Sequence, residues 1–211
     1  MKRILCYGDS NTWGTIPDGS CRHCDLNDAY PTILQRLLSK EEFTVICEGM
    51  PSRTTNQDDV KFPKGNRNGL LFYPQCVVSH DPLDYIVLFL GSNDLKAKFN
   101  RNTEDIVKTL ENDYIKFTRE QLASELTKTP KFIVICPSIV EEGKFEGFEG
   151  AYEKSIKFDS EYSQMAQNND CLYVSNEGFV CGDDGIHLVK ETHELIANRL
   201  YRLIKNDLKE S

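Results

Sequence analysis

The sequence predicts a three-layer α/β/α domain around a central, mostly parallel five-stranded sheet, a flavodoxin-like arrangement. Two observations lead to this prediction. Short apolar runs rich in β-branched residues alternate with longer amphipathic stretches, which is typical of βα units. The runs are also continuously apolar, as expected for parallel strands that are covered on both faces. Right-handed crossovers would then place helices on both faces of the sheet.

The apolar runs have the length of strands, and the stretches between them have the length of helices. We expect strands at 3–7, 43–47, 85–90, 132–136 and 171–174. We expect helices at 29–39, 70–79, 103–127, 152–167 and 188–205. Thr103 is a good N-cap residue, and the two acidic residues after it suit the positive end of a helix dipole. The last helix carries an apolar stripe that we assign to the core.

Length and charge limit the number of domains and the classes of partner. A chain of 211 residues can bury a core as one domain, so we expect a single domain over 1–211. Its net charge of −8 disfavours nucleic acid and anionic lipid as partners. No apolar run approaches the roughly 20 residues that cross a bilayer. The apolar segment after Met1 is too short for a signal peptide, so we expect a cytoplasmic protein.

The eight cysteines do not form a recognisable disulfide framework. Those in apolar strand-like runs, which we expect to be mostly reduced and buried, are Cys6, Cys47, Cys136 and Cys171. Cys21 and Cys24 bracket His23 in a polar loop, which could be half of a zinc or redox site. No second pair completes that site. We therefore expect neither a metal nor an organic cofactor.

A hydroxyl-bearing motif, Gly8-Asp9-Ser10-Asn11-Thr12-Trp13-Gly14, directly follows the first strand. Ser10 would be presented where the chain leaves the sheet, at the edge where ligands bind in such folds. Ser10 is therefore a candidate nucleophile. Two alternatives remain open at this point. Ser10 or Asp9 caps the next helix, or the turn over 10–12 holds a phosphate.

A second polar motif, Gly91-Ser92-Asn93-Asp94, follows the most apolar strand. The side-chain amide of Asn93 offers two N–H donors, which is what an oxyanion hole requires. All four residues also favour turns, and for this motif alone a plain turn is the favoured interpretation.

The third motif, Asp184-Gly185-Ile186-His187, precedes the C-terminal helix. A carboxylate three residues before an imidazole can bond its Nδ1 atom and orient Nε2 toward a hydroxyl. His187 would then act as a base. The alternative is that Asp183 or Asp184 caps the helix and His187 is exposed. We expect the other histidines on the surface: His23, His80 and His193.

Taken together and in this order, the three motifs resemble the SGNH (GDSL-type) hydrolase family. The resemblance implies a catalytic triad of Ser10, Asp184 and His187, with no cofactor. It also implies an oxyanion hole formed by the backbone amides of Ser10 and Ser52 and the side chain of Asn93. Ser52 stands where much of the family carries glycine.

Further segments resemble the bacterial arylesterase and acyltransferase branch of the family. They are Glu48-Gly49, Arg53-Thr54-Thr55, Asn68-Gly69, Pro82-Leu83-Asp84, Leu90 to Lys96 and Phe145-Glu146-Gly147. The branch implies hydrolysis of short-chain, acetyl-like esters of aryl alcohols or sugars, with acyl transfer to alcohols as a side activity. The residues expected around a small substrate pocket are Asp9, Trp13, Gly49, Phe145 and Phe148. The loop over 141–152 is either a lid or an interface of a homo-oligomer.

Two other functions remain open. One is a different hydrolase of the same family, such as a thioesterase, a lysophospholipase-like enzyme or a carbohydrate deacetylase. The other is a non-catalytic flavodoxin-like domain that binds phosphate or flavin, although this function leaves the Asp-x-x-His ending unexplained. An ordinary α/β-hydrolase is disfavoured because the chain contains no G-x-S-x-G motif.

Overall fold

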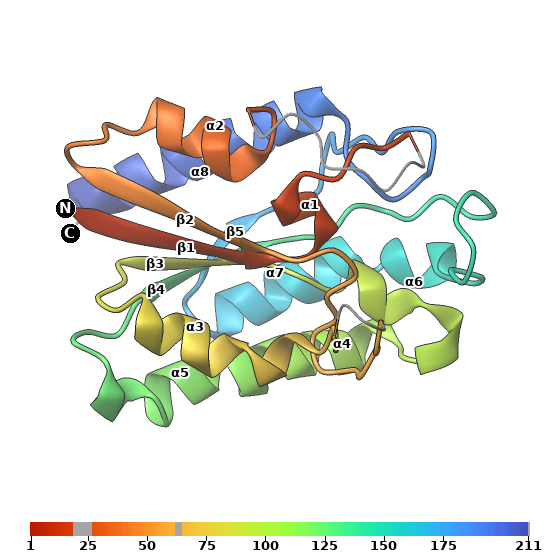
Figure 1. Cartoon of the computed structure of the whole chain (residues 1–211), viewed down its shortest axis with the longest axis horizontal. Coiled ribbons are helices and arrows are strands. Elements are labelled where there is room, and N and C mark those ends of the chain that lie inside the picture. Colours follow the sequence, from red (N-terminus) through yellow and green to blue (C-terminus); the bar gives the residue numbers. More distant parts are fainter. Residues whose placement is uncertain (19–26, 62–64, 211) are drawn as a thin grey trace.

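The computed structural model describes residues 1–18, 27–61 and 65–210, and it contains one five-stranded sheet (Figure 1). Its strands are β1 (Lys2–Gly8), β2 (Phe43–Gly49), β3 (Tyr85–Phe89), β4 (Lys131–Ile135) and β5 (Leu172–Val174). They are hydrogen-bonded in the order β2-β1-β3-β4-β5, and every neighbouring pair is parallel. The predicted α/β fold is confirmed, and the described sheet is entirely parallel.

Helices cover both faces of the sheet. One face carries α2 (Tyr30–Leu37) and α8 (Lys190–Glu210), and the other carries α3 (Tyr73–Ser79), α4 (Thr103–Thr109), α5 (Phe117–Glu120) and α7 (Phe158–Asn168). On β3, Ile86 and Leu88 pack into the core on the α3 side, whereas Tyr85, Val87 and Phe89 pack toward α2 and α8. Because alternate side chains enter two different cores, the strand is apolar at every position.

The helix expected over 103–127 is shorter and changes type along its length. After α4 the chain passes through a π-helical segment (Leu110–Lys116) into α5, which ends at Glu120 and is followed by a 3-10 turn (Ala123–Glu125). The hydroxyls of Thr109 and Thr118 bond back to the carbonyls of Asp105 and Tyr114, at 3.0 and 2.7 Å. Threonines that bond back in this way perturb regular helical geometry.

Other helix boundaries also differ from the predictions, among them those of α2, which covers Tyr30–Leu37 where 29–39 was expected, and the end of α8 at Glu210. A 3-10 turn (Gly69–Leu71) precedes α3, and the helix expected over 152–167 is divided into α6 (Tyr152–Ser155) and α7. The α8 helix begins at Lys190 instead of 188, because Leu188 forms an antiparallel bridge with Cys181. Tertiary contacts, which periodicity does not reveal, set these boundaries.

The carboxyl ends of β1, β2 and β3 lie at one edge of the sheet, near α1 (Ser10–Trp13) (Figure 1). Gly8 pairs with Gly49 where β1 and β2 end. A Cβ atom on Gly49 would lie 2.3 Å from the Trp13 backbone nitrogen, and one on Gly8 would lie 1.9 Å from Thr12 Oγ1. Glycine at both positions therefore lets α1 pack directly on the sheet edge.

The described residues were compared with two requirements: those of a membrane-spanning helix and those of a metal site. None of the described helices is both long enough and apolar enough to span a membrane. The described residues contain no cluster of three or more His, Cys, Asp or Glu side chains that could hold a metal ion. Cys21, His23 and Cys24, the half-site considered from the sequence, lie outside the described residues.

Candidate active site

Ser10 is the first residue of α1 and is hydrogen-bonded to His187. The Ser10 Oγ atom lies 2.9 Å from His187 Nε2, and both residues are buried. The carboxylate of Asp9 accepts the Asn11 N–H at 2.9 Å and so caps α1. The capping interpretation is therefore correct for Asp9, and the cap holds the turn that presents Ser10 to the imidazole.

Asp184 orients the imidazole of His187. Its Oδ2 atom lies 2.6 Å from His187 Nδ1, while its Oδ1 atom accepts the backbone N–H groups of Ile186 and His187 at 3.0 and 2.9 Å. Burial alone would raise the pKa of Asp184, but these hydrogen bonds hold it below its ordinary value. The carboxylate is therefore ionised, and Ser10, His187 and Asp184 form one continuous hydrogen-bonded chain.

Asn11 joins the first motif to the third, a role that the sequence did not reveal. Its Oδ1 atom accepts the Leu188 N–H at 3.0 Å, and its Nδ2 atom donates to the Ile186 carbonyl at 3.3 Å. These bonds hold the backbone on both sides of His187 against α1. In the sequence, the one indication of this role was that Asn11 directly follows Ser10.

Ser52 and Asn93 line the same cavity as Ser10. Ser52 has a φ of +67°, in the left-handed region that disfavours residues with a Cβ atom. This conformation gives a physical reason for glycine to be common at the equivalent position in the family that the sequence resembles. Asn93 lies in a 3-10 turn (Ser92–Leu95), so the turn expected there is present and carries Asn93 into the cavity wall.

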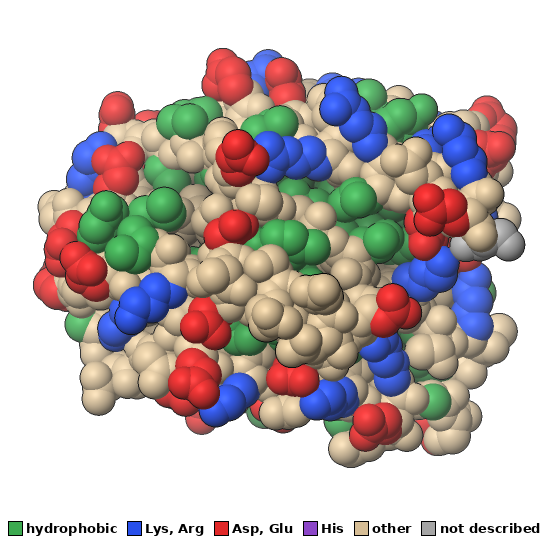
Figure 2. All heavy atoms as spheres, turned by 180° about the vertical axis from the view of Figure 1, so that it is seen from behind, with side chains coloured by type: hydrophobic (Ala, Val, Ile, Leu, Met, Phe, Trp, Pro, Cys, Tyr) green, Lys and Arg blue, Asp and Glu red, His purple; other side chains and the backbone are tan. Residues whose placement is uncertain are grey.

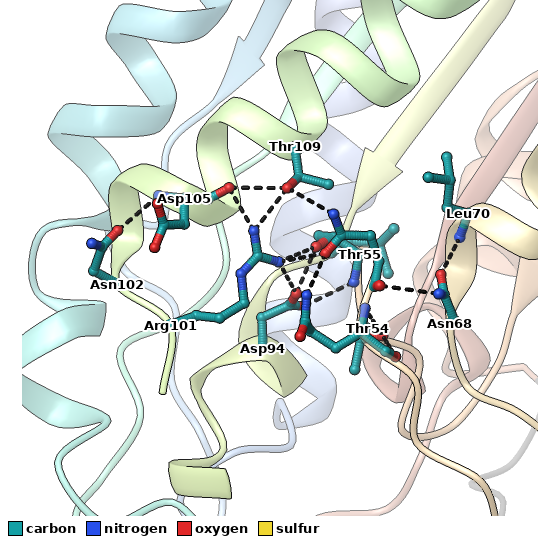
Figure 3. A network of polar contacts seen from close by, with 12 residues as sticks. Thr54, Thr55, Asn68, Leu70, Asp94, Arg101, Asn102, Asp105 and Thr109 are labelled. Atoms are coloured by element: carbon teal, nitrogen blue, oxygen red, sulfur yellow. Dashed lines mark hydrogen bonds and ion pairs between the residues drawn. The ribbon is translucent and has the colours of Figure 1, made fainter. Parts of the chain in front are cut away.

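Asp94, the residue after Asn93 in the same 3-10 turn, forms a buried ion pair with Arg101 (Figure 3). The Asp94 carboxylate is completely buried and accepts hydrogen bonds from Arg101 Nη1 at 2.7 Å and from the hydroxyl and amide of Thr55 at 2.6 and 2.9 Å. Arg101 also donates to Asn56 Oδ1 and Thr109 Oγ1, at 2.9 and 2.7 Å. The pair therefore ties the Asn93 turn to the segment after Ser52 and to α4.

The cavity above Ser10 has a volume of about 980 Å³. Trp13, Phe145 and Phe148 line it, and Phe148 also belongs to the core, as we expected for at least one of these aromatic residues. Asp9 and Gly49, also expected around the substrate, are not among the described residues that line this cavity. The Asp9 carboxylate is buried against α1, and Gly49 packs against the backbone of Trp13.

The loop over 141–152 forms part of the cavity wall. The ring of Phe145 lies 6.2 Å from the His187 ring and meets it edge-on. The Glu141 N–H donates to the Gly185 carbonyl at 2.9 Å, and the Ala97 N–H donates to the Gly147 carbonyl at 2.8 Å. The loop is thus bonded both to the turn before His187 and to the segment after Asn93, and it covers the site within this chain.

Two histidines differ from the surface positions expected for them. His193 is buried on α8, where its ring stacks on Tyr30 and burial lowers its pKa to about 4. His80 is partly buried, and its Nε2 atom lies 3.0 Å from the Glu48 carboxylate. His23 lies outside the described residues. His193 was missed although it is spaced like the apolar residues on the buried face of α8.

The described cysteines follow the expectation in part. They are all free thiols, and Cys6 and Cys136 are buried as expected. Cys171 is only partly buried, and Cys47 is exposed because its strand, β2, is at the edge of the sheet.

Asp9 and His193 contribute in opposite directions to the pH dependence of stability. Burial raises the pKa of Asp9 to about 6, so ionised Asp9 destabilises the fold above that pH, and this cost disappears as the pH falls. Because the pKa of His193 is lowered to about 4, His193 destabilises the fold as the pH falls from about 6.5 toward 4. The two contributions partly cancel between pH 4 and 6.

Replacing Asp9 by asparagine is expected to remove one of these contributions. Asparagine keeps an oxygen that can accept the Asn11 N–H, so the free energy of unfolding should rise by up to about 3 kcal/mol above pH 6 and change little near pH 4. Urea unfolding at pH 4 and pH 8 measures this difference. The control is Glu125→Gln, which replaces an exposed carboxylate. An equal change at both pH values would contradict the assignment.

Comparison with known proteins identifies the family. Residues 6–195 match the model of the GDSL-like Lipase/Acylhydrolase family. No curated protein sequence matches the chain closely enough to count as a relative.

Solved structures agree with this match. A carbohydrate acetylesterase family member from Sinorhizobium meliloti is 30% identical with a TM-score of 0.87, over 97% of this chain and 98% of that one. An aryl esterase from M. smegmatis is 29% identical with a TM-score of 0.86, over 98% and 99%. A lipase/acylhydrolase from Enterococcus faecalis, 20% identical over 98% and 97% with a TM-score of 0.68, shares the fold. The chain therefore belongs to the GDSL-like lipase/acylhydrolase family and is a carboxylic ester hydrolase.

Proposed function

We propose that this enzyme hydrolyses short-chain, acetyl-like esters of aryl alcohols or sugars through an acyl-enzyme on Ser10. The hydrogen-bonded chain from Ser10 through His187 to Asp184, at the wall of a large cavity, is the observation that carries the proposal. The names of the similar structures, a carbohydrate acetylesterase and an aryl esterase, support this substrate class.

In the proposed reaction, His187 Nε2 removes the proton of Ser10 Oγ as that oxygen attacks the ester carbonyl carbon. The ionised Asp184 stabilises the imidazolium that forms. His187 then returns the proton to the oxygen of the leaving alcohol as the carbon–oxygen bond breaks, which leaves the acyl group on Ser10. A water molecule then attacks the acyl carbonyl carbon as His187 removes its proton, and His187 returns that proton to Ser10 Oγ as the bond from Oγ to the acyl carbon breaks and the acid is released. An alcohol in place of water would give acyl transfer, which we propose as a side activity.

The negative charge on the carbonyl oxygen needs donors that are already in place. We assign this role to the backbone amides of Ser10 and Ser52 and to the Asn93 side chain, since all three residues line the cavity. Of these donors, the Asn93 amide is the one that a substitution can remove without changing the backbone.

Replacing Asn93 by alanine is expected to lower kcat by roughly 10²- to 10³-fold, because one donor to the oxyanion is lost. KM should change much less, since the charge develops only in the transition state. Initial rates with p-nitrophenyl acetate measure both parameters, and Asn198→Ala on the exposed face of α8 is a matched control. Turnover within a few-fold of wild type would show that Asn93 is not an oxyanion donor.

Covalent labelling tests the proposal directly. An organophosphonate should form a single adduct on Ser10, located by peptide mass spectrometry, and should abolish hydrolysis of p-nitrophenyl acetate. Ser160→Ala, on the exposed face of α7, should be labelled like wild type. An adduct on another residue, or inactivation without an adduct on Ser10, would overturn the proposed nucleophile.

We further propose that the chain acts as a single domain in the reducing environment of the cytoplasm. The described cysteines are all free thiols, which suits such a compartment. The sheet combines strands from residue 2 to residue 174, and α8 packs with α2 on the core of one face, which supports a single folding unit.

A further inference from the structure

The part of the cavity lined by Val60, Lys61, Arg67, Lys96 and Lys98 is positively charged. Its four cationic side chains, here called the cationic wall, are Lys61, Arg67, Lys96 and Lys98. Among the described residues that line the cavity, Glu146 is the sole carboxylate. The chain as a whole carries a net charge of −8, and acidic and basic side chains are interspersed over the face in Figure 2. The excess of positive charge in the cavity is therefore local, and its sign is opposite to that of the net charge of the chain.

Three lysines of the cationic wall share one carboxylate. Asp59 is buried, and its oxygens lie 2.7 Å from Lys98 Nζ, 3.2 Å from Lys96 Nζ and 3.7 Å from Lys61 Nζ. Burial alone would raise the pKa of Asp59, but the lysines hold it below its ordinary value, so it is ionised. One negative charge cannot neutralise three positive charges, so the group keeps a positive surplus.

Arg67 adds a further positive charge. Within the described part of the chain it takes part in no salt bridge, and its Nε atom is buried without a hydrogen-bond partner. A buried donor without a partner is unfavourable, and a guanidinium is shaped to bind carboxylate or phosphate through two parallel hydrogen bonds. An anion in the cavity would give this guanidinium, which lines it, a partner of opposite charge.

The cationic wall is connected to the proposed oxyanion site through the backbone. Lys61 and Arg67 lie next to the antiparallel bridge between Val60 and Asn66, and the Lys61 N–H donates to the Gly65 carbonyl. Lys96 lies between the 3-10 turn that carries Asn93 (Ser92–Leu95) and the next 3-10 turn (Ala97–Phe99), which carries Lys98. The positive charges are therefore held in the same cavity as Ser10.

We infer that the preferred esters carry an anionic group on their alcohol portion, which the cationic wall binds while the ester carbonyl lies at Ser10. This inference rests on the proposed function and names its substrate class. Carboxylate, phosphate and sulfonate or sulfate groups share the required chemistry. The volume of about 980 Å³ leaves room for such an alcohol beyond an acetyl group.

Matched aryl acetates test the inference. The anionic probes are 4-acetoxybenzoate, 4-acetoxyphenyl phosphate and 4-acetoxybenzenesulfonate, and the neutral probe is methyl 4-acetoxybenzoate. Each kcat/KM is divided by the hydroxide-catalysed rate constant of the same ester, which corrects for the different leaving groups. The anionic-to-neutral ratio should fall roughly 3- to 10-fold in Arg67→Gln and in Lys98→Gln. Lys108→Gln, an exposed residue on α4, is the matched control and should leave the ratio unchanged.

Salt provides an independent measurement. Raising the ionic strength from about 0.01 to 1 M shortens the screening length from roughly 30 to 3 Å, so the wild-type ratio should fall toward that of the variants. The anion with the largest ratio identifies the preferred group. If all three ratios are the same in wild type, Arg67→Gln and Lys98→Gln, the inference is wrong.

Binding separates this inference from the proposed function. In Ser10→Ala, calorimetry should show tighter binding of 4-hydroxybenzoate than of methyl 4-hydroxybenzoate, and adding Arg67→Gln should remove the difference. Equal affinities would overturn the inference even if the enzyme hydrolyses esters. By contrast, failure of the proposed function would appear as hydrolysis of the neutral ester that does not depend on Ser10.

Discussion

Replacing His187 by alanine is expected to lower kcat for p-nitrophenyl acetate by roughly 10⁴- to 10⁶-fold. In the described part of the chain, His187 is the side chain that is hydrogen-bonded to Ser10 Oγ, and Asp184 in turn orients it. Without it the serine proton has no acceptor and the leaving alcohol has no donor. Steady-state rates and single-turnover measurements with the same ester test this expectation.

Two controls make this result specific. His80→Ala removes a partly buried histidine that pairs with Glu48 and is expected to keep kcat within a few-fold of wild type. The double variant Ser10→Ala/His187→Ala should be no slower than either single variant, because the two side chains act as a unit. Multiplicative losses in the double variant, or a His187→Ala enzyme that keeps a tenth of the wild-type rate while folded, would refute the proposed roles.

The fold could be predicted because each strand is marked by a continuous run of apolar residues in the sequence. In β3, alternate side chains enter two separate cores, so the whole strand reads as one apolar run. Helix boundaries were less predictable. The end of α5 and the π-helical segment before it accompany hydroxyl bonds from Thr109 and Thr118, and the start of α8 depends on the pairing of Leu188 with Cys181.

The positions of Ser10, Asn93 and His187 could be predicted for a similar reason. Ser10 and Asn93 directly follow parallel strands, whose carboxyl ends meet at one edge of the sheet, and His187 lies in a short motif three residues after Asp184. Long-range partners could not be predicted in this way. The Asp94–Arg101 pair joins two segments through buried side chains, and the cationic wall combines Lys61 and Arg67 with Lys96 and Lys98 from a separate segment. Neither arrangement has a signature in residue spacing.

Replacing Arg101 by alanine is expected to lower the free energy of unfolding by about 3 to 5 kcal/mol, because Asp94 would remain buried without its cationic partner. Burial already raises the pKa of Asp94, against the hydrogen bonds from Thr55 and the charge of Arg101. Without Arg101 the pKa should rise further, so the destabilisation should shrink as the pH falls and the carboxyl group becomes protonated. Urea unfolding at several pH values measures both effects, with Arg202→Ala on the exposed face of α8 as the control.

Pairing Arg101→Ala with Asp94→Asn distinguishes a role of the charge pair from a simple loss of packing. If the unpaired carboxylate causes the destabilisation, the double variant should recover a large part of the lost stability. The same proteins report on positioning, since Asp94, which pairs with Arg101 (Figure 3), is the residue next to Asn93 in the 3-10 turn. A displaced Asn93 should lower kcat with little change in KM, measured well below the unfolding temperature. If Arg101→Ala costs less than about 1 kcal/mol and leaves kcat unchanged, the pair neither stabilises the fold nor holds the proposed oxyanion donor in place.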